Sequence, residues 1–138
     1  MTTFRQKTAI QIRFKDLDTL GHVNHANHIT YFELARMDYF ASLSANDSEI
    51  DWKKEGVILA KIEMDYKQPI LLEDQIFAYT EVTRLGSKSF EMTCSIVCLK
   101  NNIETEVARG KAVLVCFNYA TGASIDIPEK WKSKIMSH

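Results

Sequence analysis

The sequence has few cysteines, prolines and glycines, and it lacks any long apolar run. Its three cysteines, Cys94, Cys98 and Cys116, form no CxxC pair, and an odd count of thiols is typical of a reducing compartment. We therefore expect reduced, buried thiols and a cytoplasmic protein. No stretch reaches the ~18 apolar residues of a membrane-spanning helix, so no membrane span is predicted. The N-terminus also lacks the apolar core of a signal peptide.

An excess of one charge is also missing, because 17 basic residues stand against 18 acidic ones. There is no basic block and no basic stripe with interleaved aromatics, so we expect no nucleic-acid partner. A few local cations could still hold a small anionic ligand. The 138 residues, 46% of them hydrophobic, contain no repeat, low-complexity tract or Gly/Pro-rich linker. We expect a single domain over residues 1–138 with one core.

The hydrophobic pattern changes its period once in the first third of the chain. Residues 8–15 alternate between apolar and polar, which predicts a half-buried strand. Residues 16–25 are polar and turn-like. Residues 27–43 have helical spacing and only a narrow polar face, so we expect a helix mostly surrounded by protein. Its apolar stripe consists of Ile29, Phe32, Ala35, Tyr39 and Leu43, widened by Tyr31, Leu34 and Phe40.

Four further strands are predicted after a break near Gly56. They cover residues 61–67, 75–85, 89–100 and 104–118, and in the last of them Val107, Val113, Val115 and Phe117 are expected to share a face. Short turns such as 86–88 join antiparallel neighbours. The sequence thus predicts an α+β fold with one long helix against a large antiparallel sheet. An exposed sheet edge would be a liability, so we expect at least a homodimer.

Two aspartates, Asp16 and Asp18, lie between the first strand and the helix. Alternation would place both on one side if the strand continues. One of them could act as a base or nucleophile beside the helix N-terminus. On spacing alone, however, a role in starting the helix is favoured, because aspartates are stabilised there by capping and by the helix dipole.

The glycine turn that starts at Gly21 leads into this helix N-terminus. Helix starts carry unpaired backbone amides that suit a developing oxyanion. The amides of His25 and Ala26 are the best-placed candidates. An ordinary N-cap by Asn24 or Asn27 explains the same residues and is favoured when they are taken alone.

Three histidines raise the question of a metal site. His22, His25 and His28 are spaced i, i+3, i+6, unlike the i, i+4 pair of a helical zinc site, and Glu33 does not complete a ligand face. We expect no metal and no other cofactor. Glu33 and Arg36 have the spacing of a helical ion pair. The GxSxG, phosphate-loop and dinucleotide motifs are all missing.

Taken together, residues 16–36, DLDTLGHVNHANHITYFELAR, resemble the hot-dog-fold thioesterases of the 4-hydroxybenzoyl-CoA thioesterase type. The family pattern is matched at Asp16, Asp18, Gly21, Val23, Phe32, Glu33, Ala35 and Arg36. An aromatic–proline element at Tyr66–Pro69 and the closing strand are also similar, so the resemblance covers residues 8–128.

The resemblance implies a five-stranded antiparallel sheet wrapped around one long central helix, in a homodimer or homotetramer. It implies hydrolysis of acyl-CoA, with acyl carrier protein as an alternative carrier. Asp18 would attack the thioester or activate water, and the His25 amide would bind the thioester carbonyl. The expected substrate-binding residues are Gly21, His22, Asn24, Arg84 and Lys88, the last two for the coenzyme phosphates or merely as a solvated strand end.

The sequence departs from the family pattern at two positions. His28 replaces the usual tyrosine, and Leu20 stands where plant acyl-ACP thioesterases have an asparagine, which favours coenzyme A as the carrier. Two other functions stay open. A hot-dog hydratase is disfavoured because its Asp-x4-His spacing is absent. An acyl-CoA-binding module without hydrolysis is disfavoured because a carboxylate near the ligand carbonyl would repel the anionic ligand.

Overall fold

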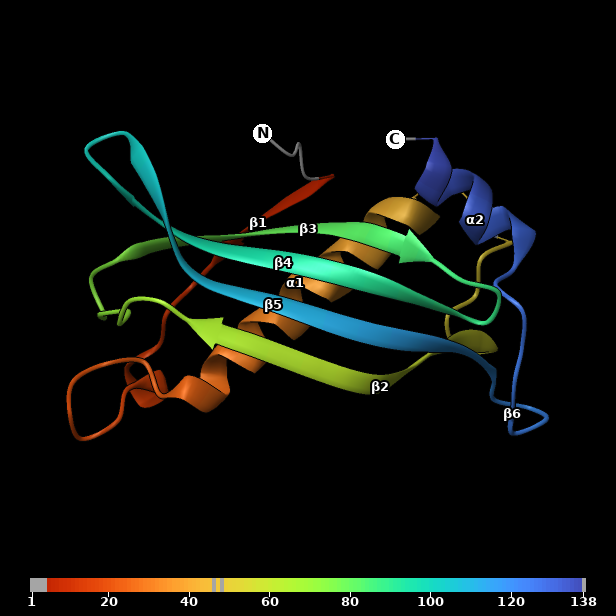
Figure 1. The fold of residues 1–138 in the computed structure, drawn as a ribbon, viewed down its shortest axis with the longest axis horizontal. Coiled ribbons are helices and arrows are strands. Elements are labelled where there is room, and N and C mark those ends of the chain that lie inside the picture. The colour runs from red at the N-terminus through yellow and green to blue at the C-terminus, as the bar shows by residue number, and fades with distance from the viewer. Residues whose placement is uncertain (1–4, 46, 48, 138) are drawn as a thin grey trace.

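The computed structural model describes residues 5–45, 47 and 49–137 (Figure 1). These ranges contain two α-helices, a short 3-10 helix and six strands. In chain order they are β1 (Gln6–Ile10), η1 (Phe14–Asp16), α1 (His25–Ser44), β2 (Glu55–Tyr66), β3 (Gln75–Leu85), β4 (Ser89–Lys100), β5 (Ile103–Asn118), β6 (Ala123–Ser124) and α2 (Glu129–Met136). The predicted α+β architecture, one long helix against an antiparallel sheet, is confirmed.

The sheet has the strand order β1-β3-β4-β5-β2, and every pairing is antiparallel. Tight turns join β3 to β4 and β4 to β5, and the second turn uses Asn101 and Asn102 at positive φ. Strands β2 and β3 follow each other in the chain but are not neighbours in the sheet. Residues 67–74 carry the chain from β2 to β3, so β2 pairs with β5 and becomes an edge strand (Figure 1).

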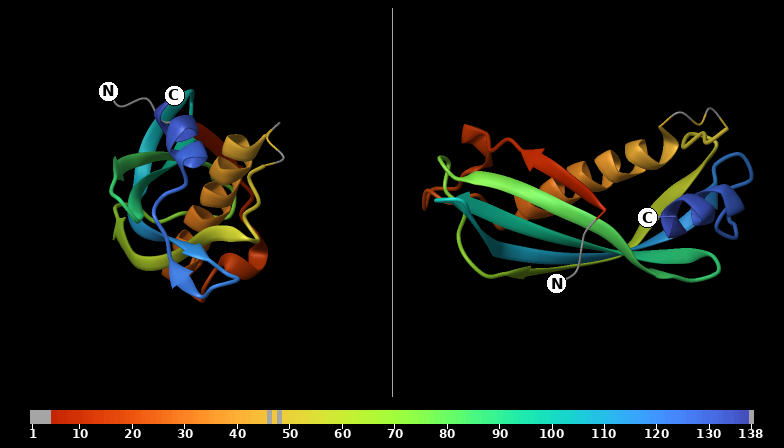
Figure 2. Two further views of the ribbon diagram at one scale, coloured as in Figure 1. Left: turned by 90° about the vertical axis from the view of Figure 1, so that its right-hand side faces the viewer. Right: turned by 90° about the horizontal axis from the view of Figure 1, so that it is seen from above.

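Helix α1 lies across the inner face of the curved sheet (Figure 2). Its buried residues pack on inward side chains of the sheet, including Met92, Cys94, Ile96, Ala112 and Leu114. Two members of the predicted apolar stripe do not belong to this core, because Ile29 is 37% and Leu34 is 53% exposed. The sheet covers only one side of the helix, so the apolar residues on the other side face outward in the single chain.

The four residues of β5 that were predicted to share a face do not all do so, because Val107 is buried at a bulge. Ala108, Ala112, Leu114 and Cys116 are buried, whereas Val113, Val115 and Phe117 are only half-buried. Both alternating sets on this strand are apolar, so periodicity alone does not identify the inner face. Packing against α1 determines which face of β5 is inward. Phe32 of α1 approaches β5 so closely that a Cβ at Gly110 would lie 2.9 Å from the Phe32 ring.

The C-terminal segment closes one end of the sheet with α2 (Figure 1). Trp131 of α2 packs on Trp52, with 4.6 Å between ring centroids. The three cysteines are buried and free, as predicted. Neither helix in the described ranges is long and apolar enough to cross a bilayer.

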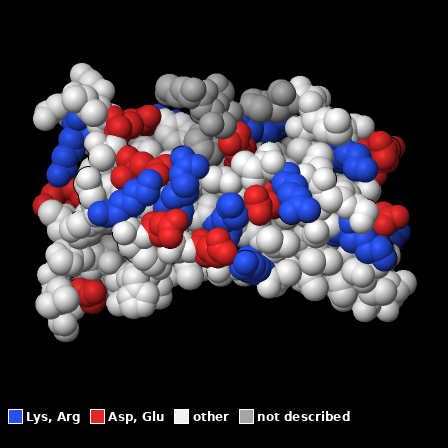
Figure 3. All heavy atoms as spheres, in the orientation of Figure 1, with Lys and Arg blue, Asp and Glu red and all other residues white. Residues whose placement is uncertain are grey.

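The outer face of the sheet carries charges of both signs in alternation (Figure 3). Glu106 pairs with Lys67 and Arg109, and Lys111 lies 4.0 Å from Glu91. These ion pairs mix opposite charges over β4 and β5. This face therefore lacks the single-sign potential that attracts nucleic acid.

Candidate active site

Asp16 is a buried structural residue, and it does not share a side with Asp18. The first strand ends at Ile10, short of the predicted residue 15, and the chain turns through η1. Asp16 is 1% exposed and accepts hydrogen bonds from the Arg13 amide (3.0 Å), the Arg13 guanidinium (3.0 Å) and the Tyr31 hydroxyl (2.7 Å). Burial acts to raise the pKa of this carboxyl, but the three hydrogen bonds outweigh burial and lower it. Asp16 therefore stays ionised and holds the loop against α1.

The loop after η1 presents Asp18 at the start of α1. Leu17 and Val23 form an antiparallel bridge, and inside it the Asp18 amide donates to the His22 carbonyl at 2.9 Å. Gly21 adopts φ +84°, which a side chain would disfavour. One carboxylate oxygen of Asp18 accepts from the Leu20 amide at 2.9 Å. The loop thus orients Asp18 with a single described hydrogen bond to its side chain.

The N-terminus of α1 supplies one backbone donor to the same place. The Asn24 side chain caps the helix by accepting from the Ala26 amide at 3.0 Å, so Ala26 is engaged. The His25 amide has no acceptor among the described residues. The Tyr66 hydroxyl, at the end of β2, donates to the His25 carbonyl at 2.8 Å and fixes this first turn. Of the two predicted oxyanion donors, His25 is the one left available.

Asp18, His22 and His25 meet at one hollow of about 330 Å³. Its other lining residues are Val23, His28, Tyr66, Lys67, Gln68 and Pro69. His28 is 3% exposed and its ring centroid lies 4.8 Å from that of Tyr66. Burial lowers the pKa of His28, so its ring is neutral at pH 7. The hollow therefore combines a carboxylate, a helix-terminal amide and neutral aromatic walls.

Arg84 and Lys88 lie far from this hollow within one chain. They belong to the end of β3 and the β3–β4 turn, at the opposite end of the sheet from the loop that carries Asp18 (Figure 1). Gly21 and Asn24, in contrast, belong to the loop itself. The structure thus brings together the predicted residues of the DLD–helix region and leaves the two predicted phosphate contacts apart.

Comparison with known proteins identifies the family. Residues 12–135 match the model of the thioesterase-like superfamily. The chain belongs to this superfamily. It is 34% identical to a thioesterase from Thermus thermophilus solved in complex with coenzyme A and Zn, over 96% of this chain and 98% of that one, with a TM-score of 0.80. Membership confirms the predicted hot-dog thioesterase family and the predicted enzyme class, a thioester hydrolase.

Two named relatives in the superfamily come from Escherichia coli. The acyl-CoA thioester hydrolase YbgC of strain O6:H1 is 23% identical over 84% of both chains. The long-chain acyl-CoA thioesterase FadM of strain K12 is 24% identical over 94% of this chain and 96% of its own. The family match over residues 12–135 includes the loop, α1 and the sheet.

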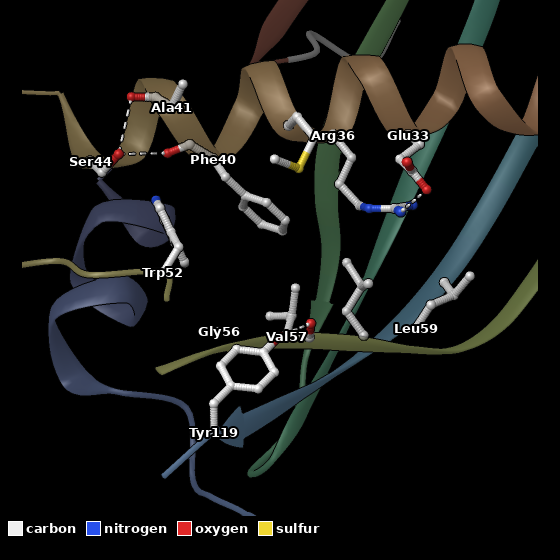
Figure 4. A pocket seen from close by; sticks show the side chains of 12 residues that line it. Glu33, Arg36, Phe40, Ala41, Ser44, Trp52, Gly56, Val57, Leu59 and Tyr119 are labelled. Carbon is white, nitrogen blue, oxygen red and sulfur yellow. Dashed lines mark hydrogen bonds and ion pairs between the residues drawn. The ribbon is translucent and has the colours of Figure 1, made fainter. Parts of the chain in front are cut away.

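Two features of this structure were not predicted from the sequence as parts of a site. Tyr66 joins β2 to the helix start, and the aromatic–proline element Tyr66–Pro69 was the available signal. A second, mostly apolar cavity of about 530 Å³ lies between α1 and β2 (Figure 4). Among the described residues, no three His, Cys, Asp or Glu side chains are grouped so that they could hold a metal ion.

Proposed function

We propose that this thioesterase hydrolyses acyl-CoA to a free acid and coenzyme A, with Asp18 as the catalytic carboxylate. The observation that carries the proposal is the meeting of the Asp18 side chain and the unengaged His25 amide at one hollow. Relatives named as acyl-CoA thioesterases over nearly the full chain support this substrate class.

The chemistry follows from these two groups. The thioester carbonyl oxygen would accept from the His25 amide, where the positive end of the α1 dipole adds to the stabilisation of the oxyanion. Asp18 would attack the carbonyl carbon directly or take a proton from an attacking water molecule. The C–S bond then breaks and the thiolate of coenzyme A leaves. After direct attack by Asp18, a water molecule hydrolyses the acyl–Asp18 anhydride, which releases the free acid and restores the carboxylate. Because a thiol has a low pKa, this leaving group needs little help from a general acid.

His22, Gly21 and Asn24 would support this arrangement from the loop. His22 lines the hollow beside Asp18, Gly21 permits the turn, and Asn24 keeps the Ala26 amide occupied while His25 stays open. Their proposed contribution is the position of the substrate and of water. Neutral His28 and Tyr66 would form the wall against which the thioester rests.

The proposed assembly is a homodimer formed through β2. In the described chain this edge strand pairs with β5 alone, and apolar residues stay exposed beside it, namely Ile29, Met37, Ile58 and Leu59. Antiparallel pairing of two β2 strands follows from two-fold symmetry. In such a dimer, the end of the sheet with Arg84 and Lys88 in one copy would lie near the Asp18 end of the other copy. Arg84 and Lys88 would then approach the phosphates of a coenzyme A bound at the other copy's site.

The test is thiol release from short, long and aromatic acyl-CoAs by the wild type and by Asp18→Asn. We expect kcat to fall by at least about 100-fold in the variant, since the amide neither attacks nor takes a proton. Asp126→Asn, an exposed aspartate outside the hollow and outside β2, is the matched control and should keep the wild-type rate. An acyl-ACP substrate in the same panel compares the two carriers.

Two results would reject the proposal. Tight acyl-CoA binding without thiol release from any member would identify an acyl-CoA-binding module. Addition of water to an enoyl-CoA, with the thioester intact, would identify a hydratase. Full hydrolysis by Asp18→Asn would keep the activity but remove Asp18 from the mechanism.

A further inference from the structure

The side chain of Arg36 is a buried cation without a complete set of partners. It is 8% exposed, and its Nη1 atom has no hydrogen-bond partner among the described residues. The nearest carboxylate oxygen, on Glu33, lies 3.7 Å from Nη2, which is beyond hydrogen-bond distance. A buried donor left unpaired is costly, and native proteins usually satisfy it. An unpaired guanidinium atom in the interior therefore indicates a place for an acceptor.

Arg36 and Glu33 lie at one end of the apolar cavity between α1 and β2 (Figure 4). Figure 4 shows the Arg36 side chain leaving α1 towards the sheet, with Glu33 beside it. The remaining walls are mainly apolar or aromatic and include Phe40, Trp52, Val57, Leu59, Leu114 and Tyr119. The cavity thus offers an apolar interior with one cation and one carboxylate at its rim.

The same two elements, α1 and β2, border both this cavity and the proposed catalytic hollow. His25 begins α1 and Tyr66 ends β2, and these two residues are hydrogen-bonded at the hollow. Further along, α1 and β2 flank the cavity at Arg36 and Leu59. The eleven residues from His25 to Arg36 correspond to about 16 Å of helix. His25, Ile29 and Arg36 follow one helical stripe, and Ile29 between them is exposed.

We infer that this cavity receives the far end of the acyl chain, and that Arg36 and Glu33 select a hydroxyl group there. The inference rests on the proposed acyl-CoA hydrolysis. With C–C bonds of about 1.5 Å, an extended chain gains about 1.3 Å per carbon, so roughly twelve carbons span the distance from the His25 amide to Arg36. A chain of this length places its terminal group beside the guanidinium.

A hydroxyl matches this pair of residues better than the alternatives. It accepts from Nη1 of Arg36 and donates to the Glu33 carboxylate, so both charged groups gain a partner. A methyl end leaves the guanidinium atom unpaired. A carboxylate end meets Arg36 but is repelled by Glu33, and it has no proton to donate at pH 7. The preferred substrate class is therefore a medium-chain acyl-CoA with a terminal hydroxyl.

The experiment compares kcat/KM for dodecanoyl-CoA, its 12-hydroxy derivative and its 12-carboxy derivative. The wild type should prefer the hydroxyl end over the methyl end by about tenfold, the size expected of one hydrogen bond to a charged group. In Arg36→Met, which keeps an unbranched apolar side chain, the preference should disappear. Arg5→Met is the matched control outside the cavity and should keep the wild-type ratio.

Glu33→Met provides a second variant that does not disturb the core, because the Glu33 side chain is 64% exposed. It removes the acceptor of the hydroxyl proton, so the ratio should fall by about threefold or more. Thermal unfolding and sedimentation of each variant test whether it is folded and assembled like the wild type. If Arg36→Met does not fold, the substrate preferences of the wild type and of Glu33→Met still test whether a terminal hydroxyl is selected.

Several outcomes would overturn the inference while leaving the hydrolase intact. These are equal rates for hydroxyl and methyl ends in the wild type, a preference for the carboxyl end, or an unchanged preference in Arg36→Met. An Arg36→Met protein that only changes its assembly, with an unaltered substrate ratio, would instead assign Arg36 to a subunit contact. No thiol release from any acyl-CoA would reject the proposed function itself.

Discussion

At the scale of single residues, the two aspartates of the DLD sequence have different surroundings. Asp16 is buried and accepts three hydrogen bonds, whereas Asp18 is partly exposed and borders the hollow beside His25. The turn of η1 between β1 and the loop separates them, because it ends the alternation that would have placed them on one side. Their proposed roles differ accordingly, with Asp16 maintaining the fold and Asp18 reacting.

We predict that Asp16→Asn lowers the free energy of unfolding at pH 7 by about 2 kcal/mol, since it removes charge-assisted hydrogen bonds in a buried place. The folded-state pKa of Asp16 is lowered, so its stabilisation is present above the unfolded-state pKa, near 4, and is lost as the pH falls through the folded value. Urea unfolding of both proteins between pH 7 and pH 3 measures this difference.

The difference between wild type and Asp16→Asn should therefore shrink as the solution is acidified. Asp65→Asn, at an exposed site, serves as the control and should differ little from wild type at any pH. A constant gap down to pH 3 would show that Asp16 acts through shape and not through its charge.

At the scale of elements, the contact between α1 and β5 sets the distance between helix and sheet. Phe32 is fully buried, and its ring lies against the backbone of Gly110. β5 also contains a bulge, since Ile96 pairs with Ala108 and Val97 with Glu106. The bulge and the small side chains of Ala108 and Ala112 let the strand curve beneath the helix.

Gly110→Ala tests this close contact. The added methyl group would lie 2.9 Å from both the Phe32 ring and the Met64 methyl, so neighbouring side chains must move. We expect a loss of about 1–3 kcal/mol in the free energy of unfolding, the usual cost of overpacking. Denaturant unfolding measures it, with Lys111→Ala, at an exposed neighbouring position, as the control. A variant as stable as wild type would show that the helix can shift away without cost.

At the scale of the whole molecule, the edge strand β2 links the proposed site, the acyl cavity and the assembly. Its last residue, Tyr66, fixes the helix start, and its first half lines the cavity. Its free edge is the proposed dimer contact. Assembly and activity should therefore depend on each other.

We predict that the wild type sediments at about twice its chain mass of 15.8 kDa and that Ile58→Lys sediments as a single chain. Ile58 is 42% exposed on β2, and a lysine there would bury a charge in the proposed contact. The rate of thiol release from acyl-CoA should also fall in Ile58→Lys, as its sedimenting mass does. Ile103→Lys, 66% exposed at the start of β5, is the matched control and should leave both unchanged. A wild-type protein that is active as a monomer would contradict this prediction.

Local patterns in the chain were enough to predict the order of the elements, the α+β class and the family. Strand-forming residues predicted the bounds of β3, and alternation predicted those of β4, because both strands are long and end in turns with strong signals. The DLD–helix motif predicted Asp18 and His25 as site residues, and both line one hollow because residues close in sequence remain close at a helix start. The cytoplasmic location and the single domain over residues 1–138 stay predictions.

Features that depend on contacts distant in sequence emerged only from the folded chain. Periodicity does not show which apolar face of β5 is inward, because that depends on where Phe32 packs. It also does not show that β2 pairs with β5, that Arg84 and Lys88 lie away from Asp18, or that Arg36 borders an apolar cavity. Each of these features depends on contacts between residues far apart in the sequence. The energy of such contacts depends on both partners, so a local sequence pattern does not predict it.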